Sequence, residues 1–199
     1  KNGFWSQAMN LGPNINTKGD DQTPFIHADN RTLYFASNGW PGYGGTDLFV
    51  SYKKVDGKWS TPTNLGYPIN TFDNEGSIAI ASNGSEGYIA SDRIDSRGEL
   101  DIYKVVLPQK ARANKTYYFN GLITDANTHK PIPGLVKLTD PKDTTKFMLI
   151  NVDSTGSFVL SIPEFDSLGI QINSPQHDYA SNILSKASLI QIAGTTQYF

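Results

Sequence analysis

The feature that most constrains the fold of this chain is a direct repeat with a period of 54 residues. The segment Gly3–Asp47 returns as Gly57–Asp101 without a gap. The residues that recur are mainly aromatic, glycine, asparagine and aspartate, and they include Trp5 and Trp59, Asn10 and Asn64, Gly12 and Gly66, Tyr34 and Tyr88, and Asp47 and Asp101. A fixed period of this size indicates a supersecondary unit copied along the chain, and such a unit cannot bury its faces alone.

Each unit is predicted to consist of short β-strands separated by turns. The run Leu33–Ala36 is almost entirely apolar, as in a strand whose two faces are both covered. The sequence Val55–Gly57 has the Asp-Gly pair of a tight hairpin. The strands are expected at Pro24–Ala28, Thr32–Ser37, Asp47–Lys53 and Lys58–Asn64 in the first full unit, and at Ser77–Ala81, Gly87–Ser91 and Leu100–Val106 in the second. The second unit is therefore expected to lack a fourth strand.

Four short strands per unit are typical of a β-propeller blade, and a propeller closes with about four to eight blades. Residues 1–10 look like the outer strand of an earlier blade. We therefore interpret residues 1–107 as the last part of a propeller, about two four-stranded blades, whose earlier blades are absent from this sequence. The alternative is that Gly3–Leu11 itself supplies the missing strand in a compact two-blade object. An open propeller exposes blade faces, so we expect this piece alone to associate or to dissolve poorly.

The sequence changes character after the second unit. Residues 108–116 are polar, basic and poor in apolar residues, so they are predicted to be a linker. From Tyr117 the repeat is gone, and about six short strands in residues 117–199 predict a small β-sandwich, the last of them near Ser188–Ile192. The fold class expected for the whole chain is all-β.

Composition argues against several functional classes. The net charge is −2 and the basic residues are scattered, whereas binding nucleic acid phosphates needs a clustered basic face. The chain has no cysteine, so it has neither a disulfide framework nor a thiolate metal site. It has no run of about 18 apolar residues, so no transmembrane segment is predicted.

Four repeated residues are predicted to be structural. Asp47 and Asp101 recur directly before the third strand of each unit. Calcium binding or general-base catalysis is one interpretation, but an active site is rarely copied into every unit. We favour a role in capping the preceding glycine-rich loop through bonds to its backbone amides. Trp5 and Trp59 also recur, and they are expected to pack between units.

Other acidic residues and the histidines show no pattern of a catalytic or metal site. Asp20–Asp21 and Asp73–Glu75 recur and have the oxygen ligands that calcium prefers, but no calcium-loop spacing is present. His27, His129 and His177 are isolated, and no nucleophile motif accompanies them. The sequence therefore predicts no catalytic residue, no metal and no cofactor.

The loop after the second strand holds the candidate partner-binding residues. Trp40 and Tyr43 lie there, and Ile94 and Arg97 occupy the same places in the next unit. Aromatic side chains on a loop can stack on a sugar or become buried in a partner. Local packing is the favoured interpretation for the two aromatic residues.

The repeat resembles the WD-like, TolB-type propeller repeats of bacterial envelope proteins. Residues 3–107 carry the resemblance through Asn-Leu-Gly-x-x-Ile-Asn-Thr and the later Gly-x-x-Asp motif. Residues 118–175 resemble a carboxypeptidase regulatory-like domain, with matches at Gly121, Thr124–Asp125, Pro131–Ile132, Gly134, Val136, Asp153, Gly156, Phe158 and Pro163. That resemblance implies a transthyretin-like or immunoglobulin-like β-sandwich. The domain has no zinc-binding motif and implies no peptidase activity.

The order of the two domains resembles the middle of large OmpA-family lipoproteins of Bacteroidetes, some of which belong to the type IX secretion and gliding machinery. This resemblance implies the cell envelope, at the periplasmic face of the outer membrane, and envelope proteins as partners. It implies peptidoglycan binding only through an OmpA-like domain that is absent here.

The function expected from this resemblance is a non-enzymatic binding or scaffold fragment. One alternative is a carbohydrate-binding module that uses Trp40 and Tyr43. Another is a fragment of a glycan-active propeller enzyme, which would need two carboxylates about 5–10 Å apart across a pocket.

Overall fold

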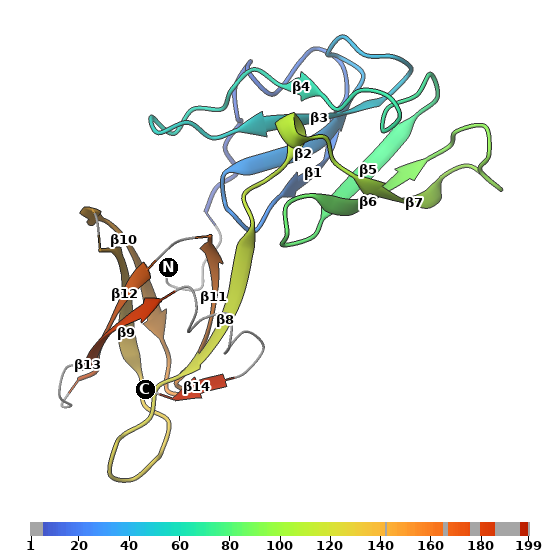
Figure 1. Ribbon diagram of the computed structural model, residues 1–199. Coiled ribbons are helices and arrows are strands. Elements are labelled where there is room, and N and C mark those ends of the chain that lie inside the picture. Colours follow the sequence, from blue (N-terminus) through green and yellow to red (C-terminus); the bar gives the residue numbers. More distant parts are fainter. Residues whose placement is uncertain (1–5, 142, 165–166, 176–179, 186–195, 199) are drawn as a thin grey trace. The chain divides into compact units, whose positions relative to one another are not determined.

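The computed structural model describes residues 6–141, 143–164, 167–175, 180–185 and 196–198 (Figure 1). Among these residues the regular elements are β-strands and a single 3-10 turn, Gln109–Ala111, so the all-β prediction is confirmed. No helix in this part of the chain is long and apolar enough to cross a membrane. The described residues divide into two compact units with the boundary after Thr116, and we call these the N-terminal and C-terminal units.

The N-terminal unit begins with a four-stranded antiparallel sheet, which we call the first meander. Consecutive strands are neighbours in the order β1-β2-β3-β4. The strands are β1 (Asp21–Ile26), β2 (Thr32–Ser37), β3 (Asp47–Tyr52) and β4 (Thr63–Asn64). Only the end of the expected strand Lys58–Asn64 is regular, and an isolated bridge between Lys53 and Trp59 extends its contact with the third strand.

The second meander has three antiparallel strands in the order β5-β6-β7. The strands are β5 (Glu75–Ile80), β6 (Glu86–Ser91) and β7 (Asp101–Val106). Each begins 54 residues after its counterpart in the first meander, as the repeat requires. In the part of the chain that the structure describes, no strand pairs with the outer edge of β7.

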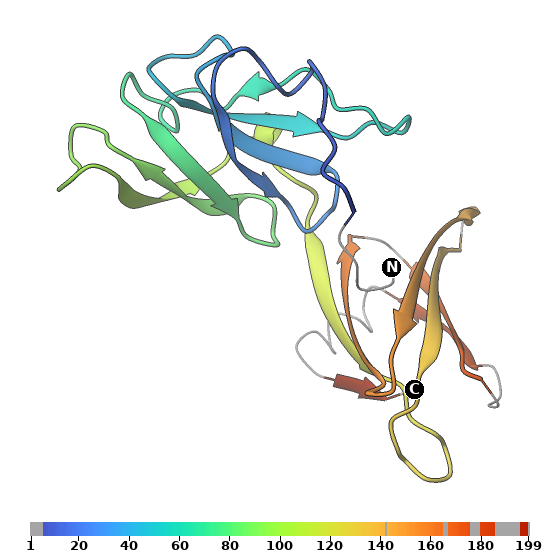
Figure 2. The same cartoon turned by 180° about the vertical axis from the view of Figure 1, so that it is seen from behind.

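The two meanders pack against each other, as both views show (Figures 1 and 2). The apolar residues between them form one cluster with members from both sheets, including Tyr34, Leu48, Val50, Ile78, Ile80 and Ile89. The opposite face of the first meander has its own cluster of Ile15, Leu33, Phe35 and Phe49. Because apolar side chains cover both faces, every residue of β2 is buried. This agrees with the continuous apolar sequence of that strand.

Residues 108–116 belong to the N-terminal unit and pack on it, although their composition predicts a linker. Ala111 is buried in the cluster between the meanders. Its carbonyl accepts a hydrogen bond of 2.7 Å from the Tyr34 hydroxyl, and the Lys110 carbonyl accepts one of 2.9 Å from the Tyr52 hydroxyl. The buried residues of this segment include the small side chains of Ala111 and Ala113. Because the segment has no large apolar residue, its sequence does not reveal that it packs on the sheets. We call residues 108–116 the strap.

The C-terminal unit consists of two sheets around one apolar core. The first sheet has the order β10-β9-β12-β13 and the second the order β11-β8-β14. In the first sheet β9 pairs antiparallel with β10 and with β12, and β12 pairs antiparallel with β13, whereas in the second sheet β14 pairs parallel with β8. The strands are β8 (Thr116–Leu122), β9 (Gly134–Asp140), β10 (Asp143–Val152), β11 (Ser157–Pro163), β12 (Ser167–Asn173), β13 (Ala180–Ser185) and β14 (Thr196–Tyr198). Phe119 and Phe158 from one sheet and Val136 and Ile170 from the other share the core.

Candidate functional site

A carboxylate at the start of each meander holds together residues from three segments. Asp21 accepts hydrogen bonds from the Thr17 amide (2.5 Å) and from the Ser37 hydroxyl (2.6 Å). The same arrangement recurs in the second meander among Thr71, Glu75 and Ser91. These oxygens are engaged by protein donors, so the carboxylates serve structure. The described residues contain no group of three or more metal-binding side chains.

Burial strongly influences the second of these carboxylates. Glu75 is fully buried, and this raises its pKa, although hydrogen bonds from Thr71 and Ser91 and the charge of Arg93 oppose the shift. Arg93 lies 3.6 Å from the Glu75 carboxylate. It also donates to the Ile69 carbonyl at 2.9 Å.

Next to each of these carboxylates lies a hydrogen-bonded pair that consists of one acidic and one amide residue. The positions of the two residue types are reversed between the meanders. In the first meander Asn38 Oδ1 accepts from the Asp20 amide at 2.8 Å. In the second, Asp92 accepts from the Asn74 amide at 2.6 Å and from the Asn74 side chain at 2.9 Å. These bonds lower the pKa of Asp92. The acid and the amide have exchanged places, and the contact is kept.

Asp47 and Asp101 bind the loops that precede their strands. Asp47 Oδ2 accepts hydrogen bonds from the amides of Tyr43 (2.9 Å) and Gly44 (3.2 Å). Asp101 Oδ2 accepts one from the amide of Arg97 (2.7 Å). This is the geometry of a side chain that caps a loop.

His27, which sequence analysis left isolated, is buried and takes part in a hydrogen-bond network with the buried Asp29. Its Nε2 lies 3.0 Å from the Ala81 carbonyl, and the Asp29 amide lies 3.2 Å from its Nδ1. Asp29 Oδ2 also accepts hydrogen bonds from the amide (3.0 Å) and side chain (3.2 Å) of Asn114. The network therefore joins the first meander, the second meander and the strap. The only signal in the sequence is a break in the repeat, because the counterparts of His27 and Asp29 are Ala81 and Asn83.

The network shifts the pKa of both titratable groups. Burial disfavours the charged form of His27, but the hydrogen bonds to Asp29 and to the Ala81 carbonyl outweigh it and raise the His27 pKa above 6.5. Burial likewise disfavours ionised Asp29, but hydrogen bonds from His27, the Arg31 amide and Thr32 outweigh it and hold the Asp29 pKa far below its usual range. The hydrogen bonds of the network thus favour the charged form of both groups.

The four candidate partner-binding residues differ in exposure. Trp40 is half-buried, packs against the cluster of Phe35 and Phe49, and donates from Nε1 to the Ile15 carbonyl at 3.1 Å. Tyr43 is 60% exposed and Ile94 is 92% exposed, and Arg97 is exposed as well. The structure thus leaves three of the four accessible and uses the indole of Trp40 for local packing.

The loops that carry these residues meet at one end of the N-terminal unit. Asn74 accepts from the Thr46 amide at 3.1 Å and donates to Asp92, so it touches both loops. A hollow of about 660 Å³ lies between them and is lined in part by Thr46, Asn74, Glu99 and Leu100. Asp92, Arg93 and Asp95 read in the sequence as a charged loop with a surface ion pair, but Arg93 lies beside the buried Glu75. Its bond to the Ile69 carbonyl takes the place of the bond from Trp40 to the Ile15 carbonyl in the first meander.

The predicted structural tryptophans can be assessed in part. Trp59 packs against the cluster of Ile15, Leu33 and Phe49, and its carbonyl accepts a hydrogen bond of 3.2 Å from Asn14. The Lys53 ammonium lies 6.0 Å from the centre of its ring. Trp5 lies outside the described residues, as do His177 and the strand expected near Ser188–Ile192.

The largest departure from the symmetry of the repeat is in the second meander. Tyr34 and Leu48 of the first meander are fully buried, whereas their counterparts Tyr88 and Ile102 are 57% and 79% exposed. Tyr88 lies opposite Lys104 in the register of β6 and β7, so these side chains share a face. We call the face formed by Tyr88, Ile102, Lys104 and Val106 the open face.

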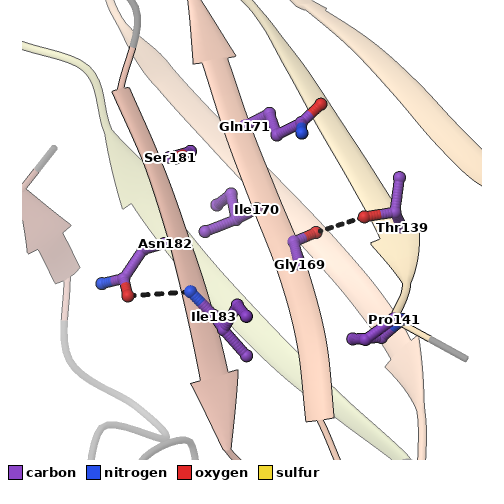
Figure 3. Close-up of a pocket in the computed structure, with 8 residues that line it drawn as sticks. All are labelled: Thr139, Pro141, Gly169, Ile170, Gln171, Ser181, Asn182 and Ile183. Atoms are coloured by element: carbon purple, nitrogen blue, oxygen red, sulfur yellow. Dashed lines mark hydrogen bonds between the residues drawn. The ribbon is translucent and has the colours of Figure 1, made fainter. Parts of the chain in front are cut away.

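A second hollow, of about 560 Å³, lies on the outer surface of the four-stranded sheet in the C-terminal unit (Figure 3). Gly169 lies in it, opposite Thr139 on one strand and Ile183 on the other. A Cβ atom at Gly169 would lie 2.5 Å from the Thr139 hydroxyl, so only glycine fits there without displacement. The described residues of the lining are polar and apolar, and none of them is ionisable.

No protein-family model matches this chain, and no curated protein matches its sequence. Among solved structures, one described as the crystal structure of S.CueP is similar at 17% identity with a TM-score of 0.31, over 61% of this chain and 75% of that one. Likeness at this level supports no conclusion about fold or function. What the chain does must therefore be argued from its own residues.

Proposed function

We propose that this chain is a non-enzymatic binding or scaffold module of an OmpA-family envelope protein. In this proposal the two meanders are blades of a partial β-propeller, and the C-terminal unit is a carboxypeptidase regulatory-like sandwich. The 54-residue offset between the meanders and the two sheets around one core support this reading. The place in the envelope, at the periplasmic face of the outer membrane, and the link to type IX secretion rest on the resemblance of the domain order.

One observation carries the binding role, and it is the open face. Tyr88, Ile102 and Val106 are 57%, 79% and 61% exposed on one surface. Burying a large apolar side chain completely is worth about 1.5–3 kcal/mol. Tyrosine is also enriched at protein interfaces, where contacts are centred on a few anchors. A protein partner that covers this face would bury apolar surface, as the second meander does where it packs against the first.

The recurring carboxylates favour a non-enzymatic role. Asp21, Asp47, Glu75 and Asp101 each accept hydrogen bonds from the protein's own amides or hydroxyls. A general base or nucleophile must instead reach a substrate. The second candidate function is carbohydrate binding through Trp40 and Tyr43. It is less well supported, because the indole of Trp40 packs against the protein and donates a hydrogen bond to the Ile15 carbonyl.

Site-specific photo-crosslinking in intact cells tests the proposal. A benzophenone amino acid replaces Tyr88, and in a control it replaces Tyr118 of the C-terminal unit, whose exposure of 54% is similar to the 57% of Tyr88. We expect a discrete adduct with an envelope protein from position 88 and none from position 118. The absence of an adduct at 88, or the same adduct from both positions, would contradict a binding role for the open face.

A further inference from the structure

The four-stranded sheet of the C-terminal unit carries two rows of side chains on its outer surface. On β9 and β12 alternate residues, such as Leu138 and Ile170, belong to the apolar core, so the residues between them lie on the outer surface. The first row across the sheet is Phe147, Thr139, Gly169 and Ile183, and the second row is Leu149, Lys137, Gln171 and Ser181. We call the surface formed by these two rows the outer face.

Apolar side chains border the outer face, and its centre is low. Phe147 and Leu149 at one border and Ile183 at the other are each more than half exposed. Gly169 lies between the borders without a side chain, in the hollow of about 560 Å³ (Figure 3). Phe147 and Ile183 are three strand spacings apart, which is about 14 Å. Large apolar side chains that gather on one surface in this way mark an interaction site.

The outer face carries little charge. None of the described residues that line the hollow is ionisable. The charged group in the two rows is the Lys137 ammonium, which lies 5.1 Å from the centre of the Phe147 ring and is attracted by that ring. A ligand with several charges would lose its hydration here without gaining opposite charges, so the surface favours a neutral ligand.

Two uncharged side chains of the outer face are available for hydrogen bonds. The amide of Gln171 and the hydroxyl of Ser181 belong to residues that lie directly opposite each other. In the part of the chain that the structure describes, neither side chain bonds to another residue. The Thr139 hydroxyl, in contrast, donates to the Gly169 carbonyl at 3.4 Å. Amide and hydroxyl groups both donate and accept, as the hydroxyl groups of a ligand require.

The face of a paired sheet suits a saccharide better than a peptide. β9 and β12 are the inner strands of this sheet, so their backbone groups bond to the neighbouring strands. A peptide lying across the face would find few partners for its own amides and carbonyls. A saccharide has C–H faces that pack on an aromatic ring such as that of Phe147. Its remaining hydroxyl groups stay in water above an open groove.

We propose that the outer face binds a neutral oligosaccharide. One sugar ring packs against Phe147 and another lies over Gly169, while hydroxyl groups bond to Gln171 and Ser181. The inference goes beyond the proposed envelope function, because it concerns a saccharide site in the C-terminal unit. It uses neither the open face nor the loop aromatics of the N-terminal unit.

Isothermal titration of the full chain with neutral pentasaccharides tests this proposal. The panel contains α- and β-linked glucose, xylose, mannose and N-acetylglucosamine oligomers. We expect at least one of them to bind saturably and Phe147→Ala to weaken that binding about tenfold. The control is Tyr118→Ala on β8 in the other sheet, because Tyr118 is 54% exposed and Phe147 56% exposed. This control should leave the binding unchanged.

A second variant separates the loss of a contact from a loss of fold. Gln171→Ala removes a hydrogen-bonding group and leaves the apolar borders intact, so it should weaken binding of the same saccharide about fivefold. Thermal unfolding of each variant checks that the unit is folded. Amide chemical shifts recorded during the titration locate the ligand, and we expect changes at Gly169, Gln171 and Ser181.

Several outcomes would overturn the proposal. They are no saturable binding of any panel member at millimolar concentration, equal weakening by Phe147→Ala and Tyr118→Ala, and shift changes confined to the N-terminal unit. A discrete protein adduct in cells when the benzophenone amino acid replaces Phe147 would also overturn it, because this face would then belong to a protein partner. Photo-crosslinking at Tyr88 reads the open face separately, so a failure here is distinguishable from a failure of the proposed function.

Discussion

At the scale of the residue, Asp29 joins its own turn to the strap. It accepts hydrogen bonds from Thr32 of its own turn and from Asn114 of the strap. Among the residues that the structure describes, its counterpart Asn83 accepts from Ser85 and Glu86 of the equivalent turn alone. The turn at Asp29 is therefore bonded to a segment distant in sequence, whereas the bonds of the turn at Asn83 stay within the turn.

The first prediction compares these two turns. We expect Asp29→Ala to lower the free energy of unfolding of the N-terminal unit by about 3 kcal/mol, since it leaves buried donors without a partner. Asn83→Ala should cost about 1 kcal/mol, as for other local caps. Urea denaturation of both variants measures the difference, and equal losses would show that the long-range bonds of Asp29 add nothing.

The second prediction concerns pH. The pKa of His27 is raised in the folded state, so protonated His27 stabilises the fold below pH 6.5. That contribution is lost as the pH rises through the folded pKa. The free energy of unfolding should therefore decrease from pH 6 to pH 8, and His27→Gln should remove this decrease.

The pKa of Asp29 is lowered in the folded state, so ionised Asp29 stabilises the fold above pH 3.8. That contribution is lost as the pH falls below 3.8 toward the folded-state pKa.

The third prediction separates packing from ligand binding at the loop aromatics. Trp40→Ala should lower the free energy of unfolding by about 3 kcal/mol, because it removes a half-buried ring from a packed cluster. Tyr43→Ala should change it by less than about 0.5 kcal/mol, since Tyr43 is 60% exposed. A glycan titration that saturates in wild type and is lost only in Tyr43→Ala would restore the carbohydrate-binding alternative.

At the scale of the element, the strap packs against the turn between β5 and β6 of the second meander. It passes so close to the turn of the second meander that a Cβ atom at Gly84 would lie 2.2 Å from the Ala113 carbonyl. Gly84 also has a positive φ of 72°. Gly57 has a similar φ of 81°, but it has open space around the position of a Cβ atom.

The fourth prediction uses this matched pair of glycines. Both Gly84→Ala and Gly57→Ala strain a left-handed backbone, at a cost of about 1 kcal/mol. Only Gly84→Ala also displaces the strap, and we expect its total loss to exceed that of Gly57→Ala by about 1–3 kcal/mol. Thermal unfolding with amide exchange at Ala113 and Asn114 measures this. Unchanged protection at those amides would argue against contact between the strap and the turn.

Most strands of the N-terminal unit were predictable from sequence, and the exceptions have physical causes. β2 and β6 follow from apolar runs between turn residues. β1 and β5 begin two or three residues earlier than expected, because each has an irregularity in register near its start. In β1 this coincides with Thr23 at a φ of 48°. In the C-terminal unit, β13 and β14 lack a clear alternation and were not predicted.

The candidate site was less predictable than the fold. Tyr43, Ile94 and Arg97 were singled out because the loops differ between units, and difference within a repeat is visible in one sequence. Their exposure fits that choice, and their role in partner binding stays a prediction. The open face was missed because Tyr88 repeats Tyr34, and identical residues give no sign that one is covered and the other exposed. The network of His27 was missed because its partners Ala81 and Asn114 are distant in sequence.

At the scale of the whole molecule, exposed apolar side chains on the open face favour association. The fifth prediction is that Ile102→Asp raises solubility and reduces concentration-dependent sedimentation. Ile94→Asp serves as the control, because Ile94 is 92% exposed and Ile102 79% exposed, but Ile94 lies in a loop outside the open face. Equal effects of the two substitutions would attribute association to general hydrophobicity and not to this surface.

The exchange of acid and amide between Asp20–Asn38 and Asn74–Asp92 limits how such a chain can be rearranged. Whole units can be copied or deleted, since each carries a complete pair. A crossover inside a unit would place Asp20 opposite Asp92, or Asn74 opposite Asn38. The first hybrid would bring two like charges to hydrogen-bonding distance, which is destabilising. A crossover that places Asp20 opposite Asp92 should therefore be selected against, whereas one that places Asn74 opposite Asn38 carries no such charge repulsion.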